Sequence, residues 1–219
     1  DVRRLRERMG AEHPRLPCFL LGHSMGSFLA RTYLIRYPGT LTGCILSGTG
    51  QERAPLVALG KLLSGIECRR LGPRGVSPLV DFLSLGAYNR RFRPNRTSAD
   101  WVSSDPAEVD AYLADPFCRH KPTVSLFRDM MGGLQLIAKP DNLEKMDPEL
   151  PVLFLSGADD PVGGMGKGVR KVFRMFQSAG CRDLTLKLYP GGRHEMFHEV
   201  NQREVFSDLL AWLEDKLPS

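Results

Sequence analysis

Two short segments carry residues whose types and spacing can do chemistry. Residues 22–26 read GHSMG, a Gly-x-Ser-x-Gly pattern in which a serine on a sharp turn can act as a nucleophile. Residues 194–198 read HEMFH; on a helix this pattern places two histidines on one face to bind zinc, with the glutamate as general base. A histidine after a strand and a glycine turn is also where serine hydrolases keep their general base. These patterns leave open whether His194 binds zinc or pairs with Ser24.

The residues around Ser24 favour the nucleophile. An apolar run at 17–22 predicts a buried strand, and the pattern at 25–38 predicts a helix that Pro38 ends. A serine between such elements sits in a strained turn that projects its hydroxyl, and the N–H of Met25 at the helix start can donate to an oxyanion. We expect both glycines of the pattern to keep Cβ atoms out of this turn. The alternative is an ordinary strand–helix turn that happens to contain serine.

Candidate partners of the serine follow two later apolar strands, at 151–157 and 184–190. Asp159 and Asp160 come after the first, although an Asp-Asp-Pro sequence is also common in plain turns. His194 follows the second strand after a Pro-Gly-Gly turn, which disfavours the helix that a zinc site would need. Ligands bind at the carboxyl ends of parallel strands, so the serine, an aspartate and the histidine are expected to meet there. We therefore expect no metal and no cofactor.

The order of elements predicts an α/β fold. Apolar strands are expected at 17–22, 42–48, 151–157 and 184–190, and helices at 2–9, 25–38, 168–178 and 205–217. This alternation is typical of a mostly parallel sheet with helices on both faces. The stretch 51–147 has no convincing strand but has helical patterns at 106–114 and 124–137, so we predict a helical cap or lid there and a core made of 1–50 and 148–219. Glycines and prolines in 51–90 predict loops between short helices, and mobility.

Composition bounds the class of protein and its surroundings. The 219 residues suffice for one sizeable domain, and no apolar run approaches the length of a membrane span. Five cysteines without a Cys-x-x-Cys pair favour a reduced, cytoplasmic setting, although a targeting segment ahead of Asp1 stays open. Seven arginines between Arg69 and Arg96 face one acid, Asp81, within a net charge of +5. Such a patch suits transient contact with a membrane or micelle, or is simply a solvated face; no nucleic-acid partner is expected.

Together the motifs resemble the monoacylglycerol lipase and lysophospholipase-like group of α/β hydrolases, the serine aminopeptidase type. GHSMG, a long helical insertion, LSGADDPV at 155–162 and YPGGRHEMFHE at 189–199 carry the resemblance. The group has Gly-x-x-Asp-x-Val at its acid and Gly-x-x-His-Glu at its base. The resemblance thus implies Ser24 as nucleophile, Asp160 as acid and His194 as base. The Met25 N–H is the oxyanion-hole donor expected from its position at the helix start.

This resemblance implies a serine hydrolase that cleaves a small-molecule, lipid-like carboxylic ester, such as a monoacylglycerol or a lysophospholipid. The same triad can also serve an aminopeptidase, a thioesterase or an acyltransferase, because pocket shape decides the substrate. A remoter alternative is a non-catalytic binding protein on the same fold, with the basic segment 69–96 as its contact surface.

The region before Ser24 is short for this fold. In such hydrolases several strands precede the nucleophile, and an early loop supplies the second oxyanion N–H. Here residues 1–17 contain one predicted helix and no strand. We therefore expect the chain to be the C-terminal portion of a longer one, with about 70–100 residues upstream. The strand at 17–22 should then have an exposed apolar edge.

Overall fold

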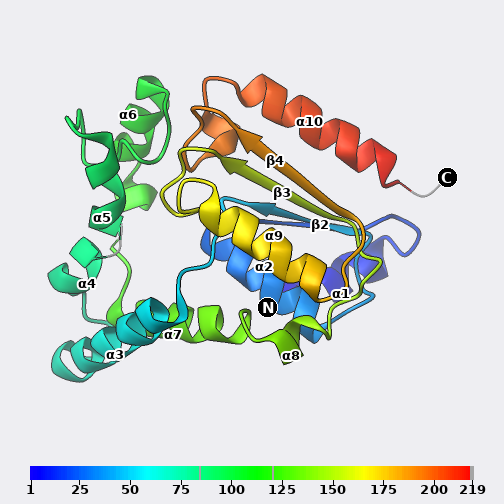
Figure 1. The fold of residues 1–219 in the computed structure, drawn as a ribbon, viewed down its shortest axis with the longest axis horizontal. Coiled ribbons are helices and arrows are strands. Elements are labelled where there is room, and N and C mark those ends of the chain that lie inside the picture. Colours follow the sequence, from blue (N-terminus) through cyan, green and yellow to red (C-terminus); the bar gives the residue numbers. More distant parts are fainter. Residues whose placement is uncertain (84, 120, 218–219) are drawn as a thin grey trace.

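Four parallel strands form the centre of the computed structural model, which describes residues 1–83, 85–119 and 121–217 (Figure 1). The strands are β1 (Phe19–His23), β2 (Gly43–Ser47), β3 (Val152–Gly157) and β4 (Leu184–Tyr189), and they lie in the order β1-β2-β3-β4. Each neighbouring pair is parallel, with Leu21 opposite Ile45 and Ile45 opposite Leu153. The four predicted strands and the α/β class are confirmed.

Helices cover both faces of this sheet. Helices α2 (Met25–Arg36) and α9 (Lys167–Ser178) lie on one face, and α10 (Gln202–Asp215) lies on the other (Figure 1). Alternate residues of each central strand enter opposite cores: Phe154 packs on the α2 and α9 side, and Leu155 on the α10 side. Because β2 and β3 are buried on both faces, their sequences are continuous apolar runs.

The first strand lies at an edge of the sheet. Among the described residues β1 pairs only with β2, and its Leu21 is 44% exposed, whereas every residue of β2 is buried. Helix α1 (Val2–Glu12) precedes β1 and has no buried residue. The expected exposed apolar edge beside the 17–22 strand is therefore present.

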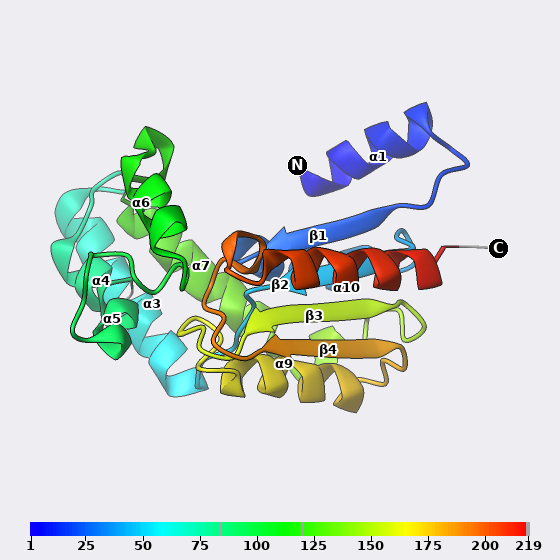
Figure 2. The ribbon, with the colours of Figure 1, turned by 90° about the horizontal axis from the view of Figure 1, so that it is seen from above.

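A helical insertion between β2 and β3 lies beyond the carboxyl ends of the strands (Figure 2). It consists of α3 (Ala54–Leu71), α4 (Pro78–Leu83), α5 (Leu85–Asn89), η1 (Arg90–Phe92), α6 (Pro106–Ala114), η2 (Pro116–Arg119), α7 (Val124–Leu136) and α8 (Pro140–Leu143). No strand occurs among its described residues. The described helices of the chain are all too short or too polar to cross a bilayer.

Helix α3 corrects one prediction. Glycines in 51–90 predicted loops between short helices, but α3 runs unbroken through Gly60 and Gly65 for 18 residues. A Cβ on Gly60 would lie 3.2 Å from Sδ of Met131 in α7, so this glycine lets the two helices approach closely. Each glycine costs a helix about 1 kcal/mol, and the packing of α3 against α7 offsets that cost.

Both ends of the insertion are attached to α2 by one buried cation. Arg31 is fully buried and donates hydrogen bonds to the Gly50 carbonyl at 2.9 Å and to Oε1 of Gln51 at 3.0 Å. It also donates to the Ile137 carbonyl at 3.4 Å, at the far end of the insertion. Burial lowers the pKa of Arg31 to about 9. The helix that follows Ser24 thus positions the start and the end of the cap.

Candidate active site

Ser24 occupies the strained turn between β1 and α2. Its backbone has φ 53° and ψ −121°, and among the described non-glycine residues only Met165, with φ 55°, also has a positive φ. Such strain costs of order 1–3 kcal/mol and persists only where the surroundings enforce it. Here the Ser24 N–H donates to the Ser47 carbonyl at 2.9 Å, and the Ser27 hydroxyl donates to the Ser24 carbonyl at 2.6 Å. Helix α2 begins at Met25, whose N–H has no intrahelical acceptor and is a donor beside the serine.

The two glycines of this turn have different roles. A Cβ at Gly22 would lie under 3.0 Å from the Gly26 carbonyl and from Cβ of Ala30, so only glycine fits there. A Cβ at Gly26 would meet no atom within 4 Å among the described residues. The expectation that both glycines keep a Cβ out of the turn is right for Gly22 and wrong for Gly26, because Gly26 contributes its carbonyl to the crowding.

Asp160 and His194 form a buried pair. Nδ1 of His194 lies 3.2 Å and 3.1 Å from the two carboxylate oxygens of Asp160, and the side chains are 3% and 0% exposed. The Val162 N–H donates to Oδ1 of Asp160 at 2.8 Å and orients the carboxylate. Asp159 is half-buried, and its backbone N–H donates to the Gly192 carbonyl. Of the two adjacent aspartates, Asp160 is the one that contacts His194.

The loops that carry this pair lie backbone against backbone. The Ala158 N–H donates to the Tyr189 carbonyl at 2.8 Å, which joins the loop after β3 to the loop after β4. A Cβ at Gly157 would lie under 3.0 Å from the carbonyls of Gly192 and Arg193. A glycine at 157 therefore lets the two loops approach closely enough for the Asp160–His194 contact.

Gly48 is a site residue that sequence reasoning missed. It follows β2, has φ +57°, and a Cβ there would lie 3.0 Å from Cε1 of both His23 and His194. Its N–H donates to the Leu155 carbonyl at 3.0 Å. The available signal was a Ser-Gly pair ending the strand, as at 156–157.

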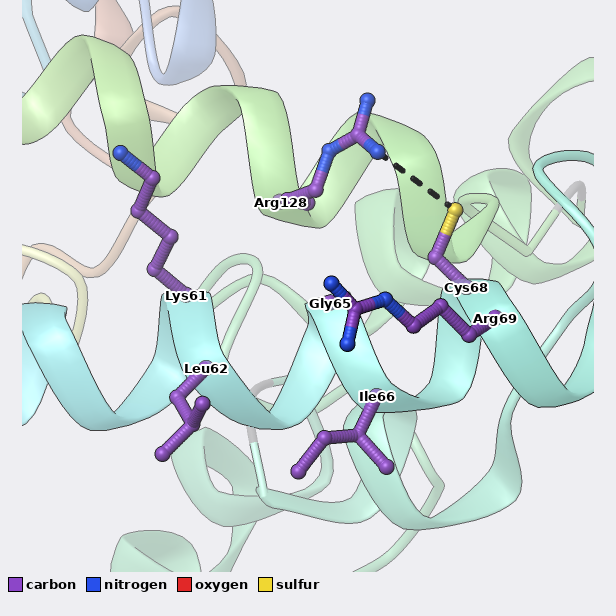
Figure 3. Close-up of a pocket in the computed structure, with 7 residues that line it drawn as sticks. All are labelled: Lys61, Leu62, Gly65, Ile66, Cys68, Arg69 and Arg128. Carbon is purple, nitrogen blue, oxygen red and sulfur yellow. Dashed lines mark hydrogen bonds between the residues drawn. The ribbon is translucent and has the colours of Figure 1, made fainter.

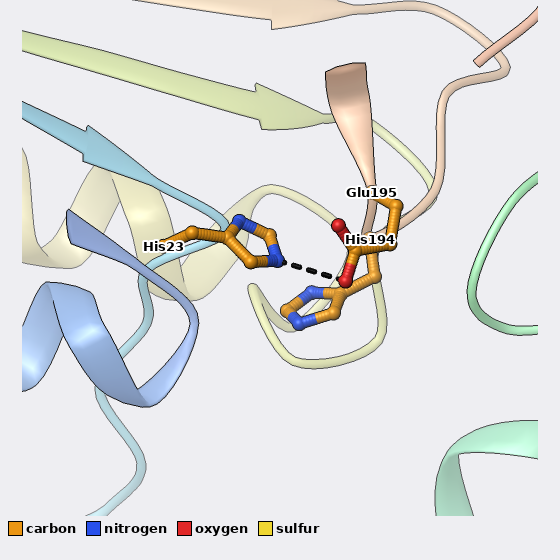
Figure 4. Close-up of side chains that lie close together, drawn as sticks. All are labelled: His23, His194 and Glu195. Carbon is orange, nitrogen blue, oxygen red and sulfur yellow. Dashed lines mark ion pairs between the residues drawn. The ribbon is translucent and has the colours of Figure 1, made fainter. Parts of the chain in front are cut away.

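His23 and Glu195 extend the site beside the base (Figure 4). The ring centroid of His23 lies 4.8 Å from that of His194, and Nδ1 of His23 lies 3.1 Å from Oγ of Ser47. Nε2 of His23 lies 3.1 Å from Oε1 of Glu195, at ion-pair distance but without hydrogen-bond geometry. Burial raises the pKa of Glu195, and its contact with His23 and the nearby His194 and His198 outweigh this effect, so the pKa falls below its usual value.

The second histidine of the HEMFH segment faces away from the first. His198 lies in η3 (Met196–His198), and its Nδ1 is 2.9 Å from Oε2 of Glu108 in α6, at an exposed position. The segment is a turn and a short 3₁₀ helix, so the two histidines do not share one face of an α-helix.

A tryptophan from the insertion covers the base. The Trp101 ring centroid lies 5.2 Å from that of His194 and 5.3 Å from that of Tyr88. Burial, followed by the negative charges of Glu52 and Asp160, raises the pKa of Tyr88 to about 12. No sequence pattern pointed to Trp101, because it lies between predicted elements.

The segment that carries this tryptophan is attached to the loop after β4. Glu199 is fully buried and accepts hydrogen bonds from the backbone N–H groups of Ser104 at 3.0 Å and Arg193 at 2.7 Å. The Glu195 N–H donates to the Val102 carbonyl at 2.8 Å. This part of the insertion is therefore a wall of the site that is hydrogen-bonded to the core.

Comparisons with known proteins agree on one family. The family model described as serine aminopeptidase, S33, matches residues 1–201. A monoacylglycerol lipase of Mycolicibacterium smegmatis is 31% identical, over 97% of this chain and 68% of its own length. Human monoglyceride lipase is 29% identical, over 99% of this chain and 64% of its own length. The structure of a thermostable carboxyl esterase from Bacillus coagulans, in complex with glycerol, matches with a TM-score of 0.89 at 28% identity, over 98% of this chain and 70% of that one. The chain spans about two thirds of the length of each relative.

Proposed function

The chain belongs to the serine aminopeptidase, S33, family and is an ester hydrolase with the α/β-hydrolase fold, and on this basis we propose that it cleaves a lipid-like carboxylic ester through an acyl-enzyme on Ser24. Monoacylglycerols and lysophospholipids are the substrate classes we favour. The observation that carries the proposal is the strained, positive-φ Ser24 at a strand–helix turn, near the buried Asp160–His194 pair.

Two contacts support the placement of Ser24 near His194. The residue before Ser24, His23, packs its ring on that of His194. The Ser24 N–H donates a hydrogen bond to the Ser47 carbonyl. Gly48, which follows Ser47 in the chain, lies against the His194 ring. The serine therefore belongs to the same small cluster as the proposed base.

The proposed mechanism assigns one task to each residue. Ser24 attacks the ester carbonyl while Nε2 of His194 takes its proton and later returns it to the leaving alcohol. Asp160 accepts from Nδ1–H of His194, which fixes the tautomer and stabilises the imidazolium. The Met25 N–H donates to the tetrahedral oxyanion, and water then releases the acid from the acyl-enzyme.

The outer surface of the cap supports a lipid substrate and transient contact with a membrane or micelle. Exposed apolar side chains gather on α3 and α4: Leu56, Leu59, Leu62, Ile66, Leu79, Phe82 and Leu83. Beside them a groove of about 260 Å³ between α3 and α7 has Lys61, Arg69 and Arg128 among its lining (Figure 3). None of the proposed catalytic residues lines this groove, so we assign it to surface contact. Basic residues at an anionic surface contribute about 1 kcal/mol each.

A labelling and turnover experiment tests the reaction. A fluorophosphonate probe should label the protein but not the Ser24→Ala variant, with Ser98→Ala as the control. On p-nitrophenyl esters of increasing chain length, kcat/KM should rise beyond acetate and fall by several orders of magnitude in Ser24→Ala. Labelling that survives in Ser24→Ala, or a preference for acetate, would contradict the proposal.

The alternatives give different outcomes in parallel assays. The name of the matching family favours aminopeptidase activity as the second candidate. Faster turnover of aminoacyl anilides than of acyl esters would establish that candidate, and acyl thioesters test a thioesterase in the same way. Added alcohol acceptors test an acyltransferase. Absence of labelling and of turnover would leave a binding protein.

Membrane contact is tested by sedimentation with anionic and neutral vesicles. Leu62→Ser and Ile66→Ser should weaken binding, because they remove exposed apolar area from α3. Leu210→Ser is the matched control, since Leu210 is equally exposed but lies on α10. Equal losses in all three variants would contradict a specific role for the cap.

A further inference from the structure

Three potential metal ligands lie close together around the proposed base (Figure 4). His23, His194 and Glu195 each offer one ligand atom, and these atoms all lie within 4.8 Å of one another. His23 comes from the end of β1, and the other two come from the loop after β4. The cluster differs from the zinc pattern of the HEMFH segment, since it uses one histidine of that segment and not the other.

Each histidine has a partner that holds one of its ring nitrogens. Ser47 Oγ lies against Nδ1 of His23, and Asp160 lies against Nδ1 of His194. When these nitrogens carry the protons, both Nε2 atoms keep their lone pairs. Metal-binding histidines are commonly oriented in this way, with a carboxylate or another acceptor on the far nitrogen.

The contact between Nε2 of His23 and Oε1 of Glu195 needs either a hydrogen or a metal ion between the two atoms. Nε2 of His23 is buried, has no hydrogen-bond partner among the described residues, and lies 3.1 Å from Oε1 of Glu195. A lone pair and a carboxylate oxygen repel each other unless a proton or a metal ion lies with them. In tetrahedral zinc sites, bonds of about 2.0–2.1 Å place neighbouring ligand atoms about 3.3 Å apart, close to this separation.

We propose that His23, His194 and Glu195 form an inhibitory binding site for zinc. The three side chains would supply three ligands, and water would supply the fourth. Asp160 occupies Nδ1 of His194, so the metal would take Nε2, the atom proposed to accept the proton of Ser24. Bound zinc would therefore prevent Nε2 of His194 from accepting the proton of Ser24, and removal of zinc would restore this role.

Calorimetry on the Ser24→Ala chain tests binding without depending on catalysis. The proposed zinc site and the proposed function both depend on His194. Because calorimetry measures zinc binding and not turnover, it tests the zinc site even if the proposed function is wrong. The chain also carries Cys118→Ser, because Cys118 is an exposed thiol that can bind zinc by itself. Zinc should bind one-to-one, and His23→Asn or Glu195→Gln should each weaken binding by about tenfold or more. A cooperative thermal unfolding transition without zinc would show that both variants fold.

His198→Asn is the matched control, since His198 pairs with Glu108 away from the cluster. It should leave zinc affinity unchanged. In the unmutated chain zinc should inhibit ester turnover, and EDTA should restore it. Loss of zinc binding in His198→Asn, full affinity in both His23→Asn and Glu195→Gln, or loss of all binding with Cys118→Ser would each overturn the proposal.

Discussion

Replacing Gly48 by alanine tests the geometry of the proposed base most directly. The change adds one methyl group at a residue with φ +57°, where a Cβ would lie 3.0 Å from Cε1 of His23 and of His194. Ordinary van der Waals contacts begin at about 3.4 Å, so at least one ring must move by a few tenths of an ångström. His194 is also held by Asp160 and Trp101, so its displacement strains the contacts that orient it.

The expected magnitudes follow from two separate effects. A left-handed backbone costs a non-glycine residue roughly 1–2 kcal/mol, which corresponds to a fall of about 2–8 °C in the thermal midpoint of a chain of this size. A shift of 1 Å in a catalytic group can lower the rate about 10²-fold, so a smaller shift of His194 should lower kcat by about 10- to 100-fold. The assay measures kcat on a short p-nitrophenyl ester, together with thermal unfolding.

Gly39 provides the control for backbone strain. It has φ +69°, and a Cβ there would meet no described atom within 4 Å. Gly39→Ala should therefore lose stability to a similar extent and keep its activity. If Gly48→Ala keeps as much activity as Gly39→Ala, the contact of Gly48 with the histidines does not position the base.

Three further predictions concern carboxylates of the site. Asp160→Asn should lower kcat by about 10³–10⁴-fold with little change in KM, measured by steady-state kinetics. The reason is that an amide favours the wrong tautomer of His194 and does not stabilise the imidazolium that forms during the reaction. The folded pKa of Glu195 is lowered, so this group stabilises the chain above the pKa of its unfolded form, and the contribution is lost as pH falls through the folded value. Glu195→Gln should thus flatten the acid side of the stability profile measured by denaturant unfolding. Glu199→Gln should destabilise the chain by about 1–3 kcal/mol and speed hydrogen exchange of the backbone amides in 99–105, because it weakens the bonds that Glu199 accepts from Ser104 and Arg193. In the unmutated chain, the amides of 99–105 should exchange more slowly than those of 54–89.

The elements of the core could be predicted from local sequence. Strands β2 and β3 are buried on both faces, so their apolar runs were recognisable without knowledge of their neighbours. The turn at Ser24 was predictable because the strand, the serine with its glycines and the helix are contiguous. The order of serine, aspartate and histidine along the chain indicated that strand ends would bring these residues to one edge.

Other features depended on residues distant in sequence. Helix α3 continues through its glycines because α7, some 70 residues later, packs against it. Helix propensity alone takes no account of such a distant partner. Trp101 and Glu199 contribute through contacts with segments about 95 residues apart, and no short pattern encodes such contacts.

The amino-acid sequence by itself determined which residues could form a serine, aspartate and histidine site, and their order along the chain. Short contiguous patterns are enough to recognise both. The motif resemblance pointed to Asp160, and the structure shows its carboxylate against Nδ1 of His194. Only the tertiary structure decided that His198 turns to Glu108 and that Gly48 lies against two imidazole rings. The physical reason is that side-chain direction and the free volume around it are set by the close approach of separate loops. Composition and residue spacing do not specify which loops approach each other, because that depends on how the strands are arranged in the sheet.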